Sequence, residues 1–350
     1  MSEEIMFEGV PQEEFERFYM VFGGHIFFET LHAAVEFDLF TKLSTHRRLT
    51  QSSICELLGI QRQPARILLL GLVTTGLLKK EGEYYFNSDL AEIVLTSHSP
   101  RNVLSYVKLQ HHVMYKGMFH LTESLREYRN VGLCEFPGDE PTLYERLGRN
   151  ADVKQIFQDA MHELSVHANR DLAQHVDLSD TKYLIDVGGG DGTNAIELAK
   201  AYPHLHTAVF DLPAMCPIAE RKIHASPQHE RVRVIAGNCF ADEFPKGADC
   251  FLFSHFCTIW SAKKNQTLFR KTYDALPENG KIIVFNMMQE NDESGPISTA
   301  VGSPYFLTIA TGEGMLYTWA EYEGWMREAG FREIQTVRLP RDHGAIIGIK

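Results

Sequence analysis

Residues 183–199 read YLIDVGGGDGTNAIELA, and this stretch decides the fold. The apolar run at its start predicts a buried strand, and the residues that follow predict a helix through Ala201. The turn between them contains Gly188, Gly189, Gly190 and Gly192. Glycines at such a turn adopt positive φ angles and let a ligand approach the backbone. We therefore predict a site for a nucleotide-like cofactor; a tight turn without a ligand is the alternative.

The spacing of these glycines excludes two common phosphate-binding loops. A dinucleotide fingerprint requires G-x-G-x-x-G, whereas the turn reads DVGGGDG, in which the last glycine comes too early. A Walker-type loop requires Lys-Ser/Thr after its glycines, and none follows.

Short apolar runs alternate with helical segments from residue 183 onward. This alternation predicts parallel strands joined by right-handed crossovers, which is a doubly wound, Rossmann-like α/β sheet. Asp211 and Asn238 end the second and third strands, where an acid can bind ribose hydroxyls and polar groups converge on one ligand. The predicted strands are YLIDVGG, TAVFDLP, VRVIAGN, DCFLFSH and KIIVFNMM.

The N-terminal part has a different pattern. Apolar residues in 12–43 recur at helical spacing, and 49–95 reads as two helices and a hairpin that turns at Lys79–Gly82, which is typical of a winged helix. Such a module often binds DNA, but the candidate recognition helix from Gln63 to Thr75 is mostly apolar, which favours packing or dimerisation. A linker near residue 140 predicts a helical domain over 1–150 and a cofactor-binding domain over 151–350.

Composition narrows the choice of partners. The chain has 350 residues and a formal net charge of −12, which opposes nucleic acid and anionic lipid and favours a small-molecule partner. No apolar run reaches the ~20 residues that a membrane span needs. The N-terminus is acidic, unlike an export signal, so we expect a cytoplasmic protein. The six cysteines show no metal-ligand spacing, so we expect no metal site.

The motifs DVGGGDG, FDLP, GNCF and ALPENGKIIV, together with the winged-helix pattern, resemble the S-adenosylmethionine-dependent small-molecule O-methyltransferases. The resemblance covers nearly the whole chain and implies a homodimeric enzyme of natural-product metabolism. It places Gly188 and Gly190 at the methionine part of the cofactor, and Asp211 at the ribose. Asn238 and Ser254 replace a usual Asp and a frequent Lys. The cofactor-binding residues implied are Asp186, Gly188, Gly190, Asp211, Leu212, Asn238, Cys239, Phe240, Ser254 and Trp260.

The catalytic segment departs from that family. Its usual His-Asp-Trp triplet contains a general base, but FCTIW places Thr258 at the position of that His, and threonine is no base near neutral pH. Another histidine is one explanation: His255, His111, His112 and His162 are candidates. An acceptor that needs no base there, such as carbon, an amine or an ionised phenol, is the other.

From the resemblance we predict methyl transfer to a small, aromatic intermediate, with oxygen as the first expectation and carbon or nitrogen as the alternative. A methyltransferase-like protein with a non-methylating reaction, and a ligand-sensing DNA-binding protein, are the remaining hypotheses. The residues expected around the acceptor are Met114, Met161, His162, Tyr305, Phe306 and Ile309.

Overall fold

The computed structural model describes residues 9–350, and its contacts divide the chain into two units, one ending at His111 and one beginning at His112. The acidic segment 1–8, on which part of the export argument rests, lies outside the described residues. The division falls before the linker that suggested a boundary at residue 150. As a functional boundary, residue 150 stays a prediction.

The first unit is mostly helical and contains a three-stranded sheet in the order β1-β3-β2. The hairpin turn lies at Gly82 and Glu83, directly after the strand β2. The predicted turn at Lys79–Gly82 is therefore too early, because Lys79 to Glu81 belong to that strand. Its elements are α1 (Gln12–Phe22), α2 (Gly24–Glu36), α3 (Leu39–His46), β1 (Leu49–Thr50), α4 (Gln51–Leu58), α5 (Arg62–Thr74), β2 (Leu78–Glu81), β3 (Tyr84–Asn87), α6 (Asp89–Val94) and α7 (Leu104–Leu109).

The helices of this unit bury a core of their own. Ala34, Leu43, Ile54, Leu69 and Leu72 are almost inaccessible to solvent and pack in one cluster. Thr50 caps α4 by accepting a hydrogen bond from the Ser53 amide, which satisfies one of the free amides at the helix start.

The second unit contains the strand-helix alternation that the sequence predicts, preceded by short helices. A π-helical turn, η2 (Gln110–Met114), crosses the division between the units. The helices are α8 (Tyr115–Met118), α9 (Leu121–Glu127), η3 (Val131–Glu135), α10 (Leu143–Arg146), η4 (Leu147–Arg149), α11 (Ala151–His175), α12 (Thr193–Ala201), α13 (Cys216–His224), η5 (Cys257–Ile259), α14 (Ala262–Ala275), α15 (Ile297–Tyr305), η6 (Phe306–Ala310) and α16 (Trp319–Ala329).

Seven strands form one sheet in the order β6-β5-β4-β7-β8-β10-β9. The first five of these are parallel to one another, whereas β10 pairs antiparallel with β8 and β9. The doubly wound sheet is thus confirmed and carries an antiparallel pair at one edge. The strands are β4 (Tyr183–Val187), β5 (His206–Asp211), β6 (Val232–Ala236), β7 (Cys250–Ser254), β8 (Lys281–Met287), β9 (Glu333–Arg338) and β10 (His343–Ile349).

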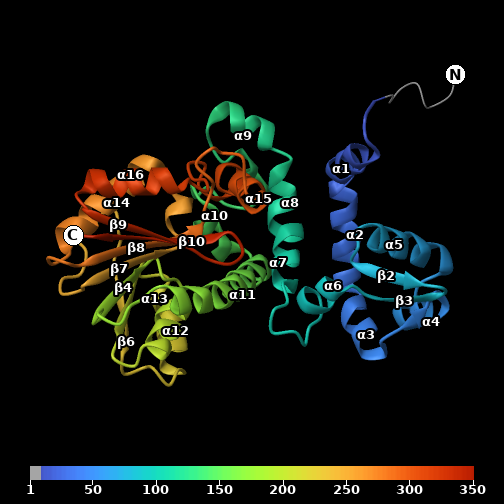
Figure 1. The fold of residues 1–350 in the computed structure, drawn as a ribbon, viewed down its shortest axis with the longest axis horizontal. Coiled ribbons are helices and arrows are strands. Elements are labelled where there is room, and N and C mark those ends of the chain that lie inside the picture. Colours follow the sequence, from blue (N-terminus) through green and yellow to red (C-terminus); the bar gives the residue numbers. More distant parts are fainter. Residues whose placement is uncertain (1–8) are drawn as a thin grey trace. The chain divides into compact units, whose positions relative to one another are not determined.

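Helices cover both faces of this sheet (Figure 1). Alternate residues of a strand point to opposite faces, so Phe251 and Phe253 of β7 pack with α14 and α16. Cys250 and Leu252 pack with α11 and α12 on the other face. Because the strands are buried on both faces, their near-continuous apolar sequences are explained.

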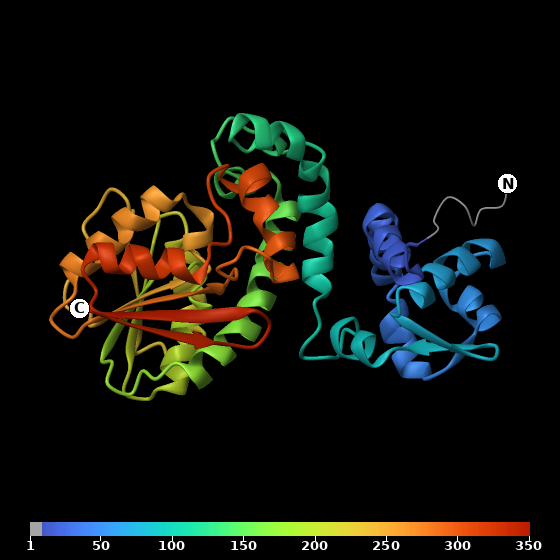
Figure 2. The same cartoon turned by 45° about the horizontal axis from the view of Figure 1, so that its top comes forward.

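The segment between residue 112 and residue 150 packs within the second unit, beside α15 and η6 (Figure 2). A Cβ atom on Gly117 would lie 2.4 Å from the Ile309 side chain, so α8 and η6 are in close contact. Asn130 Nδ2 donates a hydrogen bond to the Ala310 carbonyl at 3.2 Å. These contacts explain why the division between units precedes residue 150. No described helix is long and apolar enough to cross a membrane.

Candidate active site and cofactor site

The glycine turn after β4 has the geometry that the sequence predicts. Gly188, Gly190 and Gly192 all have positive φ angles, at 69°, 58° and 82°. A Cβ on Gly188 would lie 2.2 Å from the Phe256 ring, whereas a Cβ on Gly190 would meet no atom within 4 Å. Gly188 is therefore required by packing, while Gly190 borders open space that a ligand can enter.

Asp211, at the end of β5, closes this turn. Its Oδ2 accepts a hydrogen bond from the Gly190 amide at 2.8 Å, and its Oδ1 accepts one from the Leu212 amide at 2.7 Å. Burial raises the pKa of the Asp211 carboxyl, and the two amide bonds oppose that shift. Each carboxylate oxygen retains acceptor capacity, so the group can bind a hydroxyl pair beside the turn.

Leu212 follows directly and is 47% exposed, which is unusual for a large apolar residue at the rim of a buried sheet. An exposed leucine next to a hydroxyl-binding carboxylate suits a flat, partly apolar ring such as adenine.

Asn238 lies at the same edge of the sheet, after β6. Its side-chain Oδ1 accepts a hydrogen bond from the Phe240 backbone amide at 2.9 Å, and the Asn238 backbone amide donates to Asp242 Oδ2 at 2.8 Å. The Asn238 side chain therefore fixes its own turn. One lone pair of the oxygen is left to accept a further bond, as an adenine amino group would require.

Asp186 is completely buried at the end of β4. Burial, followed by the nearby charge of Asp211, raises its pKa well above the ordinary value. A Cβ on Gly189 would lie 2.6 Å from Asp186 Oδ2, so the turn folds tightly over this carboxyl group. A neutral carboxyl group here can donate as well as accept a hydrogen bond.

An aromatic wall stands beside these strand ends. The rings of Phe240 and Trp260 meet edge-on, with centroids 4.8 Å apart. Lys264 Nζ lies 4.6 Å from the Trp260 ring centroid and pairs with Glu313. The Trp260 indole N–H is buried and donates no hydrogen bond to the residues that the structure describes, which leaves one unpaired donor in this wall.

Cys239 and Ser254 are half-buried at the same strand ends. Burial raises the pKa of the Cys239 thiol to about 12, so this cysteine is neutral. Ser254 Oγ lies 3.2 Å from His255 Nδ1.

Together, the open Gly190, the Asp211 acceptors, the exposed Leu212 and the unpartnered Trp260 donor fit an adenosine-like cofactor. Asp211 and Leu212 can hold the ribose and adenine, with Asp186 and the glycine turn at the other end. The predicted cofactor residues are thus gathered at the carboxyl ends of β4 to β7.

Thr258, which occupies the expected base position, is only 2% exposed. Its Oγ1 lies 3.5 Å from the His255 carbonyl oxygen. A Cβ on Gly314 would lie 2.1 Å from the Thr258 carbonyl oxygen. The loop that precedes α16 therefore packs directly on the turn that contains Thr258. A buried hydroxyl held within its own turn is no proton acceptor.

His255 has a positive φ of 52°, and its ring turns toward β8 and β10. Its Nε2 lies 3.0 Å from His343 Nε2. Burial, and secondarily the neighbouring His343, lowers the pKa of His255 to about 3. So low a proton affinity suits a general base poorly, because an effective base has a pKa near the working pH.

His162, on α11, lies beside the glycine turn. Its Nδ1 is 3.0 Å from Lys222 Nζ and 3.4 Å from Thr193 Oγ1. Lys222 Nζ also donates to Asp191 Oδ2 at 2.6 Å. Burial, and then the positive charge of Lys222, lowers the pKa of His162. This network joins α11, the turn and α13.

The other two histidine candidates lie elsewhere. His111 ends the first unit, where its Nδ1 is 3.0 Å from Glu29 Oε1 and its ring stacks on His32 with centroids 3.7 Å apart. His112 begins the second unit and is exposed.

The residues expected around the acceptor are only partly brought together. Tyr305 and Phe306 have ring centroids 5.2 Å apart at the junction of α15 and η6. Ile309 is buried against α8, and Met114 is the residue that directly precedes this helix. Met161 is half-buried on α11. Tyr144 is half-buried, and burial of its phenol raises the pKa of that group to about 12.

Sequence reasoning missed Lys222, Asp191, Lys264 and Glu313, which support the site through ion pairs. Asp191 and Thr193 were within the quoted glycine motif, but Lys222 comes from the following helix, and no local pattern connects it to the turn. Lys264 and Glu313 are 49 residues apart.

The seven-stranded sheet, with acceptor groups and a glycine turn at its carboxyl edge, is that of an S-adenosylmethionine-dependent methyltransferase. The O-methyltransferase domain model matches residues 119–332, the O-methyltransferase dimerisation domain model matches residues 19–97, and the chain belongs to this family.

Two relatives and two solved structures set the range of chemistry. An L-tyrosine C(3)-methyltransferase of Streptomyces lavendulae is 38% identical over 95% of this chain and 92% of its own length. A 3-hydroxy-5-methyl-1-naphthoate 3-O-methyltransferase of Streptomyces sahachiroi is 32% identical over 92% and 91%. The apo methyltransferase SibL superposes with a TM-score of 0.86, at 34% identity over 95% and 98%. Human N-acetylserotonin methyltransferase, solved with S-adenosylmethionine, gives 0.82, at 26% identity over 98% and 99%.

Proposed function

We propose that this enzyme methylates a carbon of a phenolic ring, next to the hydroxyl group, with tyrosine or a close derivative as the acceptor. The observation that carries the proposal is the lack of a competent base at the expected position. Thr258 is buried there, and His255 has a pKa of about 3. The Streptomyces lavendulae relative, which matches almost the whole chain, is named as a methyltransferase of the tyrosine ring carbon C(3).

The moment at which the acceptor loses its proton explains why a carbon acceptor suits a site without a base. An attacking hydroxyl group must lose its proton as the oxygen–methyl bond forms, so a base beside the oxygen is valuable. A ring carbon would lose its proton only after the carbon–methyl bond has formed and the sulfur–methyl bond has broken, with the thioether as the leaving group. The methylated ring is then a strong acid, and water or a weak acceptor can take that proton.

S-adenosylmethionine, when bound, supplies an electrophilic methyl group on a positively charged sulfur. Asp211 would hold the ribose, Leu212 would pack on adenine, and Gly190 would leave room for the methionine part. The chain's contribution is then chiefly orientation, which by itself can lower a barrier by several kcal/mol.

Loss of a ring deuteron tests the acceptor atom. L-tyrosine deuterated at both positions next to the hydroxyl is incubated with enzyme and methyl-labelled S-adenosylmethionine. Transfer to carbon should release one deuteron per product, and NMR should show an aryl methyl group. A methyl product that keeps both deuterons would overturn the proposal and indicate oxygen or nitrogen as the acceptor.

A panel of phenolic acids and hydroxynaphthoates, run in parallel, distinguishes the other hypotheses. O-methylation of a hydroxynaphthoate would favour the chemistry named for the Streptomyces sahachiroi relative. Tight cofactor binding without transfer to any acceptor would favour a non-methylating reaction.

We further propose that residues 1–150 form a winged-helix dimerisation domain that contributes to the acceptor pocket, and that residues 151–350 bind the cofactor in a cytoplasmic homodimer. Supporting the dimer are the family match over 19–97 and apolar side chains on α1, α2 and α5 that are more than half exposed. The largest are Phe18, Tyr19, Val21, Phe22, Ile26, Ile67 and Leu70.

The dimer predicts a result for Leu70→Glu. Leu70 is 69% exposed on α5, so a charge there should leave the fold intact and weaken association. Analytical ultracentrifugation should find a larger monomer fraction than for Arg62→Glu, an exposed control on the same helix. A wild-type chain that sediments as a monomer would contradict the dimer.

A further inference from the structure

Three side chains of different chemistry converge on the surface of the second unit, away from the strand ends. His120 Nε2 lies 2.9 Å from Glu135 Oε1 and 3.5 Å from Cys134 Sγ. One donor atom of each residue lies within 4.8 Å of the other two. Cys134 and Glu135 are exposed and His120 is half-buried, so a dissolved ion can reach all three.

The backbone holds these residues in place through a close contact between two glycines. A Cβ on Gly132 would lie 2.4 Å from the Gly117 carbonyl oxygen, so only glycine lets η3 approach α8 this closely. His120 comes three residues after Gly117, and its amide donates to the Gly117 carbonyl at 3.1 Å. Cys134 comes two residues after Gly132. The glycine contact therefore brings the imidazole beside the thiol.

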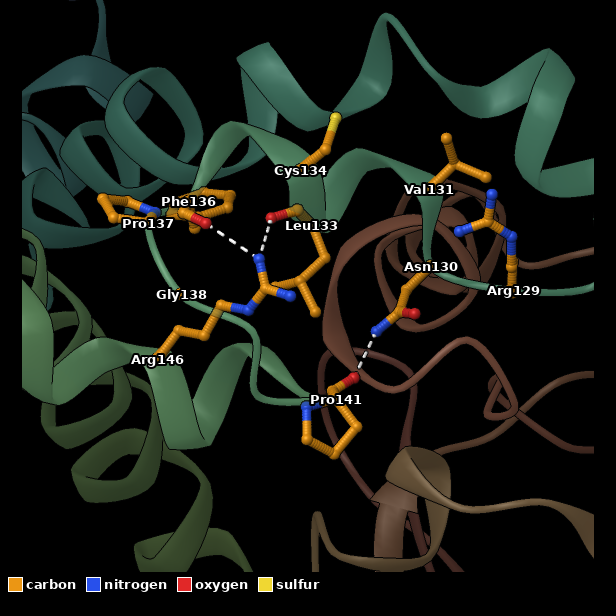
Figure 3. Close-up of a pocket in the computed structure, with 10 residues that line it drawn as sticks. All are labelled: Arg129, Asn130, Val131, Leu133, Cys134, Phe136, Pro137, Gly138, Pro141 and Arg146. Atoms are coloured by element: carbon orange, nitrogen blue, oxygen red, sulfur yellow. Dashed lines mark hydrogen bonds between the residues drawn. The ribbon is translucent and has the colours of Figure 1, made fainter.

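Arg146 fixes η3 from its other side. Its Nη1 donates to the Leu133 and Phe136 carbonyl oxygens at 2.9 and 2.8 Å, and these bonds border a cavity of about 510 Å³ (Figure 3). Figure 3 also shows that the Cys134 sulfur points away from the Arg146 guanidinium. The thiol is thus directed away from the positive charge that would repel a cation.

The arrangement is not that of a catalytic relay. In a thiol–imidazole–carboxylate relay, the thiol and the carboxylate contact different nitrogens of the ring. Here both contact the same atom, Nε2. One nitrogen has a single proton or lone pair to share, whereas three donor atoms around a common point match the coordination of a metal ion.

The distances agree with zinc. Ordinary Zn–S, Zn–N and Zn–O bonds in a tetrahedron put nitrogen and sulfur about 3.5 Å apart, and nitrogen and oxygen about 3.4 Å apart. The observed nitrogen–sulfur separation of 3.5 Å matches this geometry, and the nitrogen–oxygen separation of 2.9 Å needs to lengthen by about half an ångström. One thiolate and one carboxylate also balance the two positive charges of the ion.

We propose that His120, Cys134 and Glu135 bind one Zn²⁺ ion, with the fourth coordination position open to solvent. A nitrogen, a sulfur and an oxygen donor form a set that suits this borderline ion better than Mg²⁺ or Ca²⁺, which prefer oxygen donors alone. The bound ion would join the start of α9 to η3. The site was not predicted from sequence because 13 residues lie between His120 and Cys134, which is no recognised metal-ligand spacing.

Binding of Co²⁺ as a spectroscopic substitute for Zn²⁺ tests the ligands directly. The tag-free, full-length reduced protein is titrated with Co²⁺, and a near-ultraviolet thiolate-to-cobalt charge-transfer band should rise to one equivalent and disappear on addition of Zn²⁺. Calorimetry with Zn²⁺ should give the same stoichiometry. Loss of an outer-shell partner already costs about 10–100-fold in metal affinity, so loss of a ligand should cost at least about tenfold.

Cys134→Ser should abolish the band, whereas His120→Ala and Glu135→Gln should weaken Zn²⁺ binding. Cys55→Ser and His229→Ala remove a half-buried thiol and an exposed imidazole elsewhere and should change neither result. Circular dichroism checks that each variant is folded, and Glu135→Gln provides the test should the other two fail to fold. Substoichiometric binding by the wild type, or a band that survives Cys134→Ser, would overturn the proposal.

Discussion

His255 and His343 face each other through their Nε2 atoms at 3.0 Å, one at the end of β7 and the other at the start of β10. Burial lowers the pKa of both rings, and each would repel a proton on the other. The pair is therefore neutral at physiological pH, with one ring donating a hydrogen bond to the other. The histidine nearest the expected base position in sequence is thus part of the sheet's packing.

The activity of His255→Asn tests this interpretation. Because the pKa of His255 is about 3, its titration should not shape the pH–rate profile between pH 6 and 9. We expect the profile to keep its midpoints even if the rate falls with packing. A lost or shifted acidic limb in steady-state kinetics would instead identify His255 as the base.

Stability should depend on pH through the same residue. The folded-state pKa of about 3 is below the unfolded value of about 6.5, so the unfolded chain takes up the proton first. This contribution to the free energy of unfolding is fully present above pH 6.5 and is lost as pH falls toward 3. Urea unfolding of the wild type and His255→Asn should converge by about 1–2 kcal/mol between pH 7 and pH 5. A constant difference between the two would contradict the low pKa.

Two glycine substitutions should have different effects. Gly188→Ala forces a Cβ to 2.2 Å from Phe256 and should destabilise the fold. Gly190→Ala has space for its Cβ, and its positive φ costs about 1 kcal/mol, so the protein should fold but bind S-adenosylmethionine more weakly. Calorimetry measures the affinity and thermal unfolding measures the stability. Gly247→Ala, also open and at positive φ, is the matched control and should keep its affinity.

Asp211→Asn should weaken cofactor binding about 10–100-fold, because hydrogen bonds to a charged group contribute about 1.5–3 kcal/mol. Titration calorimetry with S-adenosylhomocysteine measures this without turnover. Asp274→Asn removes a carboxylate from an exposed position on α14 and should bind as the wild type does. Equal affinities for Asp211→Asn and the wild type would show that the ribose assignment is wrong.

Removal of Lys222 should raise the pKa of His162, since the lysine charge is one of the two causes that lower it. NMR titration of the His162 ring in Lys222→Gln should show its midpoint at a higher pH than in the wild type. Arg221→Gln, the neighbouring exposed cation on α13, should leave the midpoint unchanged. A midpoint that stays in place in Lys222→Gln would mean that the lysine charge does not contribute to this pKa.

The placement of the predicted cofactor residues at one edge of the sheet could be derived from sequence because its determinants are local. A strand, a glycine turn and a helix are adjacent in the chain, and parallel strands bring their carboxyl ends to one edge, so Asp186, Asp211 and Asn238 had to meet there. The glycines were predicted from the strand-to-helix turn, and Leu212 from the family resemblance.

The proton chemistry and the surface chemistry depended on tertiary structure. Nothing near His255 in the sequence indicates that its ring would face His343, 88 residues later, and lose its basicity through burial. The His120–Cys134 approach likewise depends on the contact between Gly117 and Gly132. The period of the apolar residues and the spacing of the glycines determine helices, strands and turns, because these patterns act over a few residues. The pKa values and the sets of metal ligands depend on burial and on side chains far apart in sequence, which only the folded chain brings together.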